Sequence, residues 1–265
     1  MMINIFSIWT IAKRELKSLF VSPVAYVVLG LFAFGTGYYF TFSMQRFDAL
    51  LRDAQLQARM MQNPDMLNYI NLNSFLINNV TSFTFMLLLF CAPFFCMRLF
   101  TEERINSTYE LLMTSPISVT EIVLGKFVAA SLFLLVVLAT HSIFLAVMFG
   151  FGNPEIGPVL SSYLGLFLAG MSFLAIGLFA SSITKHQIIA VIVAMAINLS
   201  LLMISWGAEN AYENLSLFLN KAAITSHFEN FNQGVIYVSS SVYFLSLIAL
   251  FLSMGQIAVR SFSRS

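Results

Sequence analysis

The feature that most constrains this chain is a series of six apolar runs, each long enough to cross about 30 Å of hydrocarbon as a helix. Charged residues make up only 9% of the sequence, and hydrophobic residues make up 59%. A soluble domain carries about 25% charged residues, so this chain could not cover a core of its own size in water. The sequence therefore predicts an all-α membrane protein with a single membrane domain over residues 1–265. Its six predicted transmembrane helices are 22–43, 78–97, 127–149, 159–181, 187–206 and 237–259.

Lysine and arginine residues are distributed unequally between the two sides of these spans. If the N-terminus is cytoplasmic, nine of them lie inside and four lie outside. An excess of basic residues marks the cytoplasmic side, so both termini and the segment 98–126 are predicted to be cytoplasmic. The nine are Lys13, Arg14, Lys17, Arg98, Arg104, Lys126, Lys185, Arg260 and Arg264, and the four are Arg46, Arg52, Arg59 and Lys221.

Residues 1–21 are predicted to form a separate helix before the first span. At about 100° per residue, the apolar side chains of 5–20 gather in one stripe, and Lys13, Arg14 and Lys17 lie outside it. Such a helix lies in the inner-leaflet interface, and Ser22-Pro23 then ends it. The alternative is that the segment only anchors the topology. The stripe comprises Ile5, Ile8, Trp9, Ala12, Leu16, Leu19 and Phe20, whereas Phe6 and Ile11 fall outside it.

The sequence lacks the common motifs of catalysis. It contains no G-x-x-x-x-G-K-[ST] phosphate loop, no H-E-x-x-H and no G-x-S-x-G, so the chain is not expected to be an enzyme. Cys91 and Cys96 have no histidine or further cysteine at ligand spacing, which favours buried apolar residues over a disulfide or a metal site. His141 is the only ionisable group deep in a span. We interpret it as a neutral imidazole bonded to a neighbouring helix near Thr140 or Ser142, and a proton path is the alternative.

The segment 98–126 concentrates seven charged residues between two apolar spans. "TEERINSTYELLMT" has a helical composition, "SPIS" interrupts it, and "VTEIVLGKF" is predicted to start a second helix with Thr120 as its cap and Glu121 in its first turn. This helical elbow could bind a soluble partner through ion pairs. It could equally be a solvated loop whose charges keep it out of the lipid. The residues alone leave both interpretations open.

The same segment resembles the cytoplasmic loop of type-2 ABC exporter permeases. In that family a pattern like M-R-x-x-x-E-E-(K/R)-x-x-x-T-x-E-L-L-x-x-x-P-(I/V)-x-x-x-E-I-V-L-G-K recurs. "GNPEIGPVLSSYLGL", "AIGLFASSITKHQIIA" and "SHFENFNQGVIY" are similar to the gliding-motility (GldF) branch, although Ser107 and Tyr237 depart from its usual pattern. Seventeen positions match the loop pattern: Met97, Arg98, Glu102, Glu103, Arg104, Thr108, Glu110, Leu111, Leu112, Pro116, Ile117, Glu121, Ile122, Val123, Leu124, Gly125 and Lys126.

The resemblance implies a permease subunit of the bacterial inner membrane that couples ATP hydrolysis by a separate cytoplasmic ATPase to export, with a possible link to gliding motility. The expected partners are that ATPase, a second permease copy, an accessory membrane-anchored outside subunit and the lipid bilayer, but not nucleic acid. ATP and Mg would be bound by the ATPase, and this chain would bind no cofactor. The expected ATPase-docking residues are Glu102, Glu103, Arg104, Thr108, Glu110, Pro116, Glu121, Lys185 and His186, and the expected membrane-interface residues are Trp9, Lys13, Arg14 and Lys17.

Two other functions stay open at this point. The outside segments 44–77 and 207–236 could hold a partner that ATP-driven motion moves without any transport. The first of them begins with a helical pattern, and the second is apolar enough to lie at the outer surface or to dip into it. A secondary carrier is less favoured, because the spans lack acidic groups and repeat symmetry. The sequence does not identify a substrate.

Overall fold

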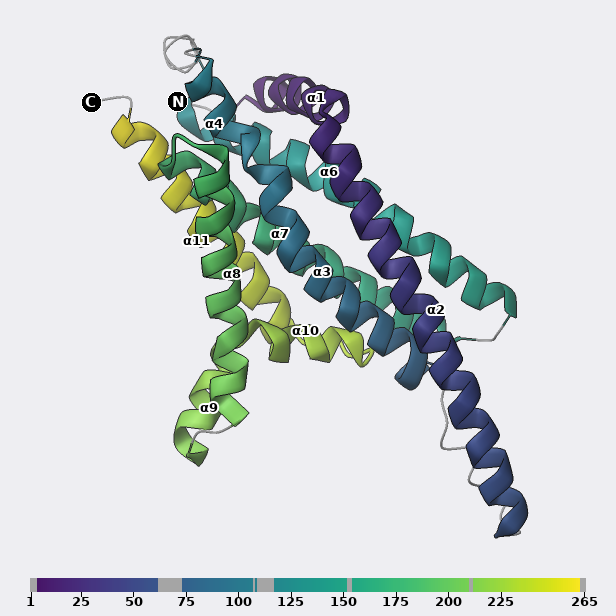
Figure 1. The fold of residues 1–265 in the computed structure, drawn as a ribbon. Coiled ribbons are helices and arrows are strands. Elements are labelled where there is room, and N and C mark those ends of the chain that lie inside the picture. Colours follow the sequence, from purple (N-terminus) through teal and green to yellow (C-terminus); the bar gives the residue numbers. More distant parts are fainter. Residues whose placement is uncertain are drawn as a thin grey trace.

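A computed structural model of the chain describes residues 4–61, 73–106, 108, 117–151, 154–209 and 212–262. Within these residues every regular element is helical, which confirms the predicted all-α class. Figure 1 shows the arrangement of these helices. They are α1 (Ile5–Val21), α2 (Pro23–Met60), the π-helical turn η2 (Asn73–Ile77), α3 (Asn78–Cys96), α4 (Arg98–Ile105), α6 (Val119–Phe151), α7 (Ile156–Ile183), α8 (Gln187–Glu209), α9 (Glu213–Ala222), α10 (Ile224–Asn232) and α11 (Val238–Phe262).

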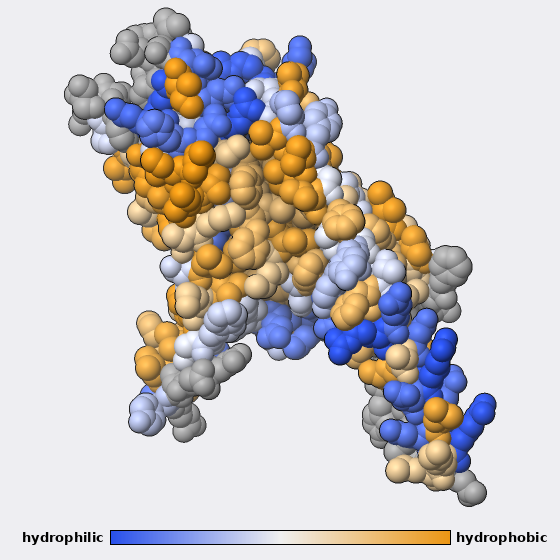
Figure 2. Space-filling model, viewed as in Figure 1, coloured by the Kyte–Doolittle hydropathy of each residue, from blue (hydrophilic) through white to orange (hydrophobic). Residues whose placement is uncertain are grey.

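Six helical stretches are long and apolar enough to cross a membrane, as predicted. They are α2, α3 with its extension into α4, α6, α7, α8 and α11. Figure 2 shows an apolar belt around the middle of the bundle. Hydrophilic residues gather at the end formed by α1 and α4, and along the part of α2 that projects from the opposite end. This distribution is that of a multi-pass membrane protein.

Several helices are longer than the predicted spans. α2 continues without a break to Met60, where the span was expected to end at residue 43, and α6 begins at Val119 rather than near 127. Residues 44–60 contain neither glycine nor proline and are rich in strong helix formers, so nothing stops the backbone ladder where the apolar run ends. Hydropathy indicates which part of a helix lies in the lipid, but it does not indicate where the helix ends. The Asn-rich residues 62–72 lie outside the described part of the chain.

α7 is the central helix of the bundle and contacts α3, α6, α8, α10 and α11. Its glycines allow this close packing. A Cβ at Gly177 would lie 2.8 Å from Cys96 Cβ of α3, and one at Gly165 would lie 2.6 Å from Phe231 Cβ of α10. α10 buries Phe228 as well as Phe231 against the bundle, so this part of the segment 207–236 dips into the fold.

Pro93 lies inside α3. A proline removes the N–H that would bond the carbonyl four residues earlier, here Leu89 O. Asn198 of α8 donates its Nδ2 to that carbonyl at 3.2 Å. The freed backbone group is therefore satisfied from another helix, which is how membrane helices tolerate proline.

His141 is buried, and its Nδ1 lies 3.2 Å from Thr84 Oγ1 of α3. The expected hydrogen bond to a neighbouring helix is confirmed. Its partner, however, is neither Thr140 nor Ser142, because those two hydroxyls donate to carbonyls of their own helix. His141 thus joins α6 to α3, as buried polar side chains do in membrane bundles.

The contact at Gly165 yields the first prediction. Gly165→Ala should lower the free energy of unfolding by about 1–3 kcal/mol, because the added methyl group overpacks the core. The neighbouring atom is a Cβ, which cannot move away without its backbone. Gly30→Ala is the control, since a Cβ there meets nothing within 4 Å. Thermal unfolding of the purified protein would measure both, and an equal effect of the two substitutions would contradict the packing described here.

Candidate functional site

Four segments that are far apart in the sequence meet at one end of the bundle. They are α1, α4, the start of α6 and the short connection 184–186 between α7 and α8. The C-terminal end of α11 lies at this same end of the bundle (Figure 1). Figure 2 shows that this end is hydrophilic, whereas the belt below it is apolar. The structure thus places α1 and the predicted elbow against each other.

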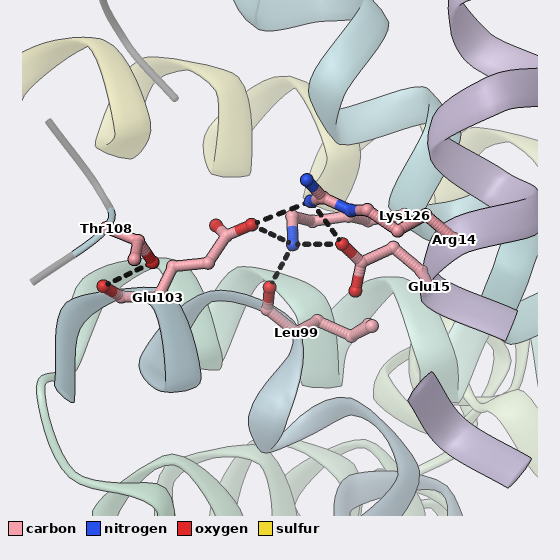
Figure 3. Close-up of polar contacts among 6 residues, drawn as sticks. All are labelled: Arg14, Glu15, Leu99, Glu103, Thr108 and Lys126. Atoms are coloured by element: carbon pink, nitrogen blue, oxygen red, sulfur yellow. Dashed lines mark hydrogen bonds and ion pairs between the residues drawn. The ribbon is translucent and has the colours of Figure 1, made fainter. Parts of the chain in front are cut away.

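Lys126 is the centre of this arrangement, as Figure 3 shows. Its Nζ lies 3.1 Å from Glu15 Oε1 of α1 and 2.9 Å from Glu103 Oε1 of α4, and it also donates to Leu99 O. The Lys126 side chain is only 1% exposed. A buried ammonium is tolerated only when such partners replace its water. Lys126 of α6 therefore ties together α1 and α4, and the ring of Phe100 lies 5.1 Å from Nζ.

Arg14 extends this network to the surface. Its Nη2 donates to Glu15 at 2.7 Å and to Glu103 at 3.2 Å, while its side chain stays 60% exposed. Burial alone would raise the pKa of Glu15, but the charge of Lys126 and hydrogen bonds from Arg14 and Lys126 outweigh it. The pKa of Glu15 is consequently lowered, which favours its carboxylate form beside Lys126 and Arg14. We call Arg14, Glu15, Glu103 and Lys126 the charge cluster.

α1 packs on the first turns of α6 through a face that differs from the predicted stripe. Ile11, Ala12 and Leu19 are its buried residues, although Ile11 was placed outside the stripe, and Ile5 and Trp9 are exposed. A Cβ at Gly125 would lie 2.8 Å from Ile11 Cβ, so the glycine lets the two helices touch. The charge cluster lies along the same contact. Because Glu15 pairs with Lys126, the buried face of α1 is rotated away from the predicted apolar stripe.

Two arginines of α4 bond to other parts of the same end. Arg104 donates from Nη1 to Thr184 O at 2.7 Å and from Nη2 to Ser182 O, which joins the elbow to the end of α7 and the turn that follows. Arg98 pairs with Glu102 at 2.8 Å and donates to Ser22 between α1 and α2. The elbow helix is therefore bonded to elements on both of its sides.

Ser118, not Thr120, caps α6. Ser118 Oγ accepts from Glu121 N at 3.3 Å, and Glu121 Oε2 accepts from Ser118 N at 2.8 Å. This is a reciprocal capping box, and its S-x-x-E spacing is present in the sequence as Ser118 and Glu121. The second oxygen of Glu121 accepts from Asn4 N at 2.6 Å, which also fixes the start of α1. Glu121 is buried and serves the fold rather than the surface.

The expected docking residues thus fall into two groups. Glu103, Arg104 and Glu121 point into the molecule, where Glu103 Oε1 and the polar atoms of the other two bond to further parts of the chain. Thr108, Lys185 and His186 are exposed, and the Glu102 side chain is 35% exposed despite its pairing with Arg98. Trp9, Lys13, Arg14 and Lys17, the expected interface residues, are exposed along α1. Glu110 and Pro116 lie outside the described residues.

Sequence reasoning missed Glu15 and assigned no role to Lys126. Two signals could have found them. Lys126 is the one charged residue in the stretch "IVLGKFVAA", where a charge needs a partner. Glu15 is three residues after Ala12 and four before Leu19 and therefore lies on the buried face of α1.

Removal of the central cation should destabilise the fold. Lys126→Met leaves Glu15 and Glu103 facing each other, and a broken buried ion pair costs about 3–5 kcal/mol. Thermal unfolding would show the loss. Combining Lys126→Met with Glu15→Gln and Glu103→Gln should recover much of it, because no unpaired charge remains. Lys185→Met, at an exposed position, serves as the control, and a stable Lys126→Met protein would refute the role of the cluster.

Acid should weaken the same contact. Because the pKa of Glu15 lies below its ordinary value of 4.5, its carboxylate stabilises the fold above pH 4.5, and this contribution is lost as pH falls through the folded pKa. The Tm of the unmodified protein should therefore fall more steeply below pH 4.5 than that of Glu15→Gln, which cannot gain a proton there. Tm series at decreasing pH would test this, and parallel series would contradict it.

Comparison with known proteins identifies the family. A family model described as "ABC-2 family transporter protein" matches residues 9–265, which covers nearly the whole chain and all six candidate spans. Among curated proteins, none matches the sequence significantly. The matched region includes the charge cluster, the elbow and the α7–α8 connection. The chain therefore belongs to the ABC-2 family of transporter proteins, as a membrane permease subunit of an ABC transporter.

Proposed function

We propose that the hydrophilic end formed by α1, α4 and the 184–186 connection is the cytoplasmic surface on which the ATPase subunit docks. A permease subunit of this family pairs with an ABC ATPase subunit and is not itself expected to be an enzyme. ATP and Mg would be bound in that partner. The basic residues at this end of the chain favour its cytoplasmic placement, with both termini inside and the chain in the inner membrane.

The observation that carries this proposal is the bonding of Lys126 to Glu15 and Glu103. It unites α1, α4 and α6, and Arg104 adds the end of α7. A displacement of the elbow by the ATPase would therefore move several helices together. A partner can bias the bundle only through contacts that differ between its two states, and a surface bonded to four helices can transmit such a difference.

The structure supports a division of labour among the expected docking residues. Glu102, Thr108, Lys185 and His186 are accessible and would contact the ATPase. Glu110 and Pro116 join this group through the family pattern alone. Glu103, Arg104 and Glu121 are occupied inside the molecule and would transmit the motion instead.

Export, gliding motility, the second permease copy and the accessory subunit rest on the resemblance of the loop and of the later segments. One further observation supports a second copy: α2, α8 and α11 expose large apolar side chains that a partner helix or lipid must cover. No feature of the described residues identifies the substrate.

A scaffold that moves an outside partner without transport is the second candidate. The part of α2 beyond residue 43 and α9 project separately from the end opposite the elbow (Figure 1). α9 exposes Leu217 and Phe218. These projections could hold such a partner, and ATP hydrolysis without flux would favour this reading. The secondary carrier loses its basis, because the chain is a permease of the ABC-2 family.

The docking surface can be tested by co-purification. The tagged chain, expressed together with its genomic neighbours, should retain an ABC ATPase. Lys185→Glu combined with His186→Glu should lower the recovered ATPase about tenfold, since two new carboxylates in place of a cation and an imidazole would oppose association. Lys221→Glu is the matched control. Lys221 is exposed and lies in α9, at the end of the bundle opposite the elbow (Figure 1).

Coupling can be tested separately from docking. Glu103→Gln should retain the ATPase but reduce the effect of the permease on ATP hydrolysis, because it weakens the bond to Lys126. Failure of any ATPase to co-purify would remove the docking proposal. If the double variant and the native chain recovered equal amounts of ATPase, the ATPase would dock at a different surface.

A further inference from the structure

A crevice of about 350 Å³ lies between α4 and the junction of α1 with α2. Arg14 and Lys17 of α1 and Arg98 of α4 line it, together with Glu102 and the apolar Val21 and Pro23. A water molecule occupies about 30 Å³ of liquid, so the crevice has room for roughly a dozen waters or for one phosphate ester group. It is open on one side and is therefore accessible to a ligand.

The lining carries more positive than negative charge. Three of these side chains are cations, and Glu102 is the one carboxylate among the lining residues. Glu102 pairs with Arg98 at 2.8 Å, and Arg14 pairs with Glu15 and Glu103 of the charge cluster, so Lys17 is the lining cation that remains. Lys17 is exposed and has no ion-pair partner among the described residues. A ligand with a phosphate group would supply the missing anion, and guanidinium and ammonium groups both bind phosphate well.

The apolar part of the lining indicates where this anion comes from. Val21 is 73% exposed beside the crevice. Tyr26 and Val27, on the first turns of the span below it, are also largely exposed. A ligand seated among the cations would therefore have an apolar surface leading directly toward the hydrocarbon. An anionic headgroup would contact the cations, and its acyl tail would cover the apolar surface beside them. A free anion would leave that apolar surface uncovered.

We propose that this crevice binds the phosphate headgroup of an anionic phospholipid of the inner leaflet. The proposal rests on one part of the proposed function, namely that α1 lies at the cytoplasmic surface of the membrane. Basic pockets between membrane helices on that side bind anionic headgroups. Arg14 belongs both to this crevice and to the charge cluster, so a bound headgroup would lie beside the bonds that unite α1 with the elbow.

Lipid retention by the purified full chain tests the proposal. The protein would be exchanged into bilayer discs that contain phosphatidylglycerol and phosphatidylcholine in equal amounts, and the lipids that stay bound after gentle extraction would be counted by native mass spectrometry. Phosphatidylglycerol should be enriched. Lys17→Gln should weaken its retention about tenfold, because it removes a charge-assisted hydrogen bond to the phosphate. Arg98→Gln should weaken it further, with thermal unfolding confirming that the protein is folded.

Lys13→Gln is the matched control. Lys13 and Lys17 are exposed lysines one turn apart on α1, but only Lys17 lines the crevice. Equal losses for the two variants would mean a diffuse surface attraction and would overturn the proposal. So would displacement of the lipid by inorganic phosphate at the same concentration, because that result would identify a site for a soluble anion.

The lipid measurement needs no ATPase, so its result is independent of docking. Retention of phosphatidylglycerol without any co-purifying ATPase would support the proposed lipid site and refute the proposed docking surface. The opposite pair of results, docking without lipid preference, would remove only the lipid site.

Discussion

The ion pairs of the Lys126 ammonium group are the interaction on which the rest of the hydrophilic end depends. This group lies at the start of a long apolar helix and is shielded from water, where an unpaired charge would cost several kcal/mol. That cost is offset only if a carboxylate of α1 and a carboxylate of α4 reach the same point. The burial of one cation thus fixes the positions of two other helices. Gly125, directly before it in the chain, permits the close contact that this geometry requires.

This constraint explains why a loop rich in charge is not simply a solvated surface. Its inward residues satisfy each other and the ends of neighbouring helices, as Arg104 does for the carbonyls that close α7. The other residues at this end, such as Lys185 and His186, are exposed and accessible to a partner. Both properties fit the function proposed for this end. The exposed residues would bind the ATPase subunit, and the bonds beneath them would carry its motion into the spans.

A lipid bound in the crevice, as proposed, would connect the charge cluster to the membrane. Arg14 contacts Glu15 and Glu103 on one side and lines the crevice on the other. A lipid headgroup bound there would alter the electrostatic surroundings of bonds that hold α1 to the elbow. The composition of the inner leaflet could in this way influence coupling, and the mechanism would need no movement beyond a change in occupancy.

The sequence by itself determined the features that depend on consecutive residues. These are the six apolar spans, the separate helix before them, the helical elbow and the need to compensate Pro93. The tertiary structure alone decided which side chains meet. Glu15 and Lys126 are 111 positions apart, His141 finds Thr84 rather than a neighbour in sequence, and Arg104 closes α7. α6 and α7 are apolar on nearly every side, so no periodic pattern indicates how they are rotated about their axes. Their rotation follows from the packing of glycines and from the cost of leaving a charge unpaired, and both depend on the whole bundle.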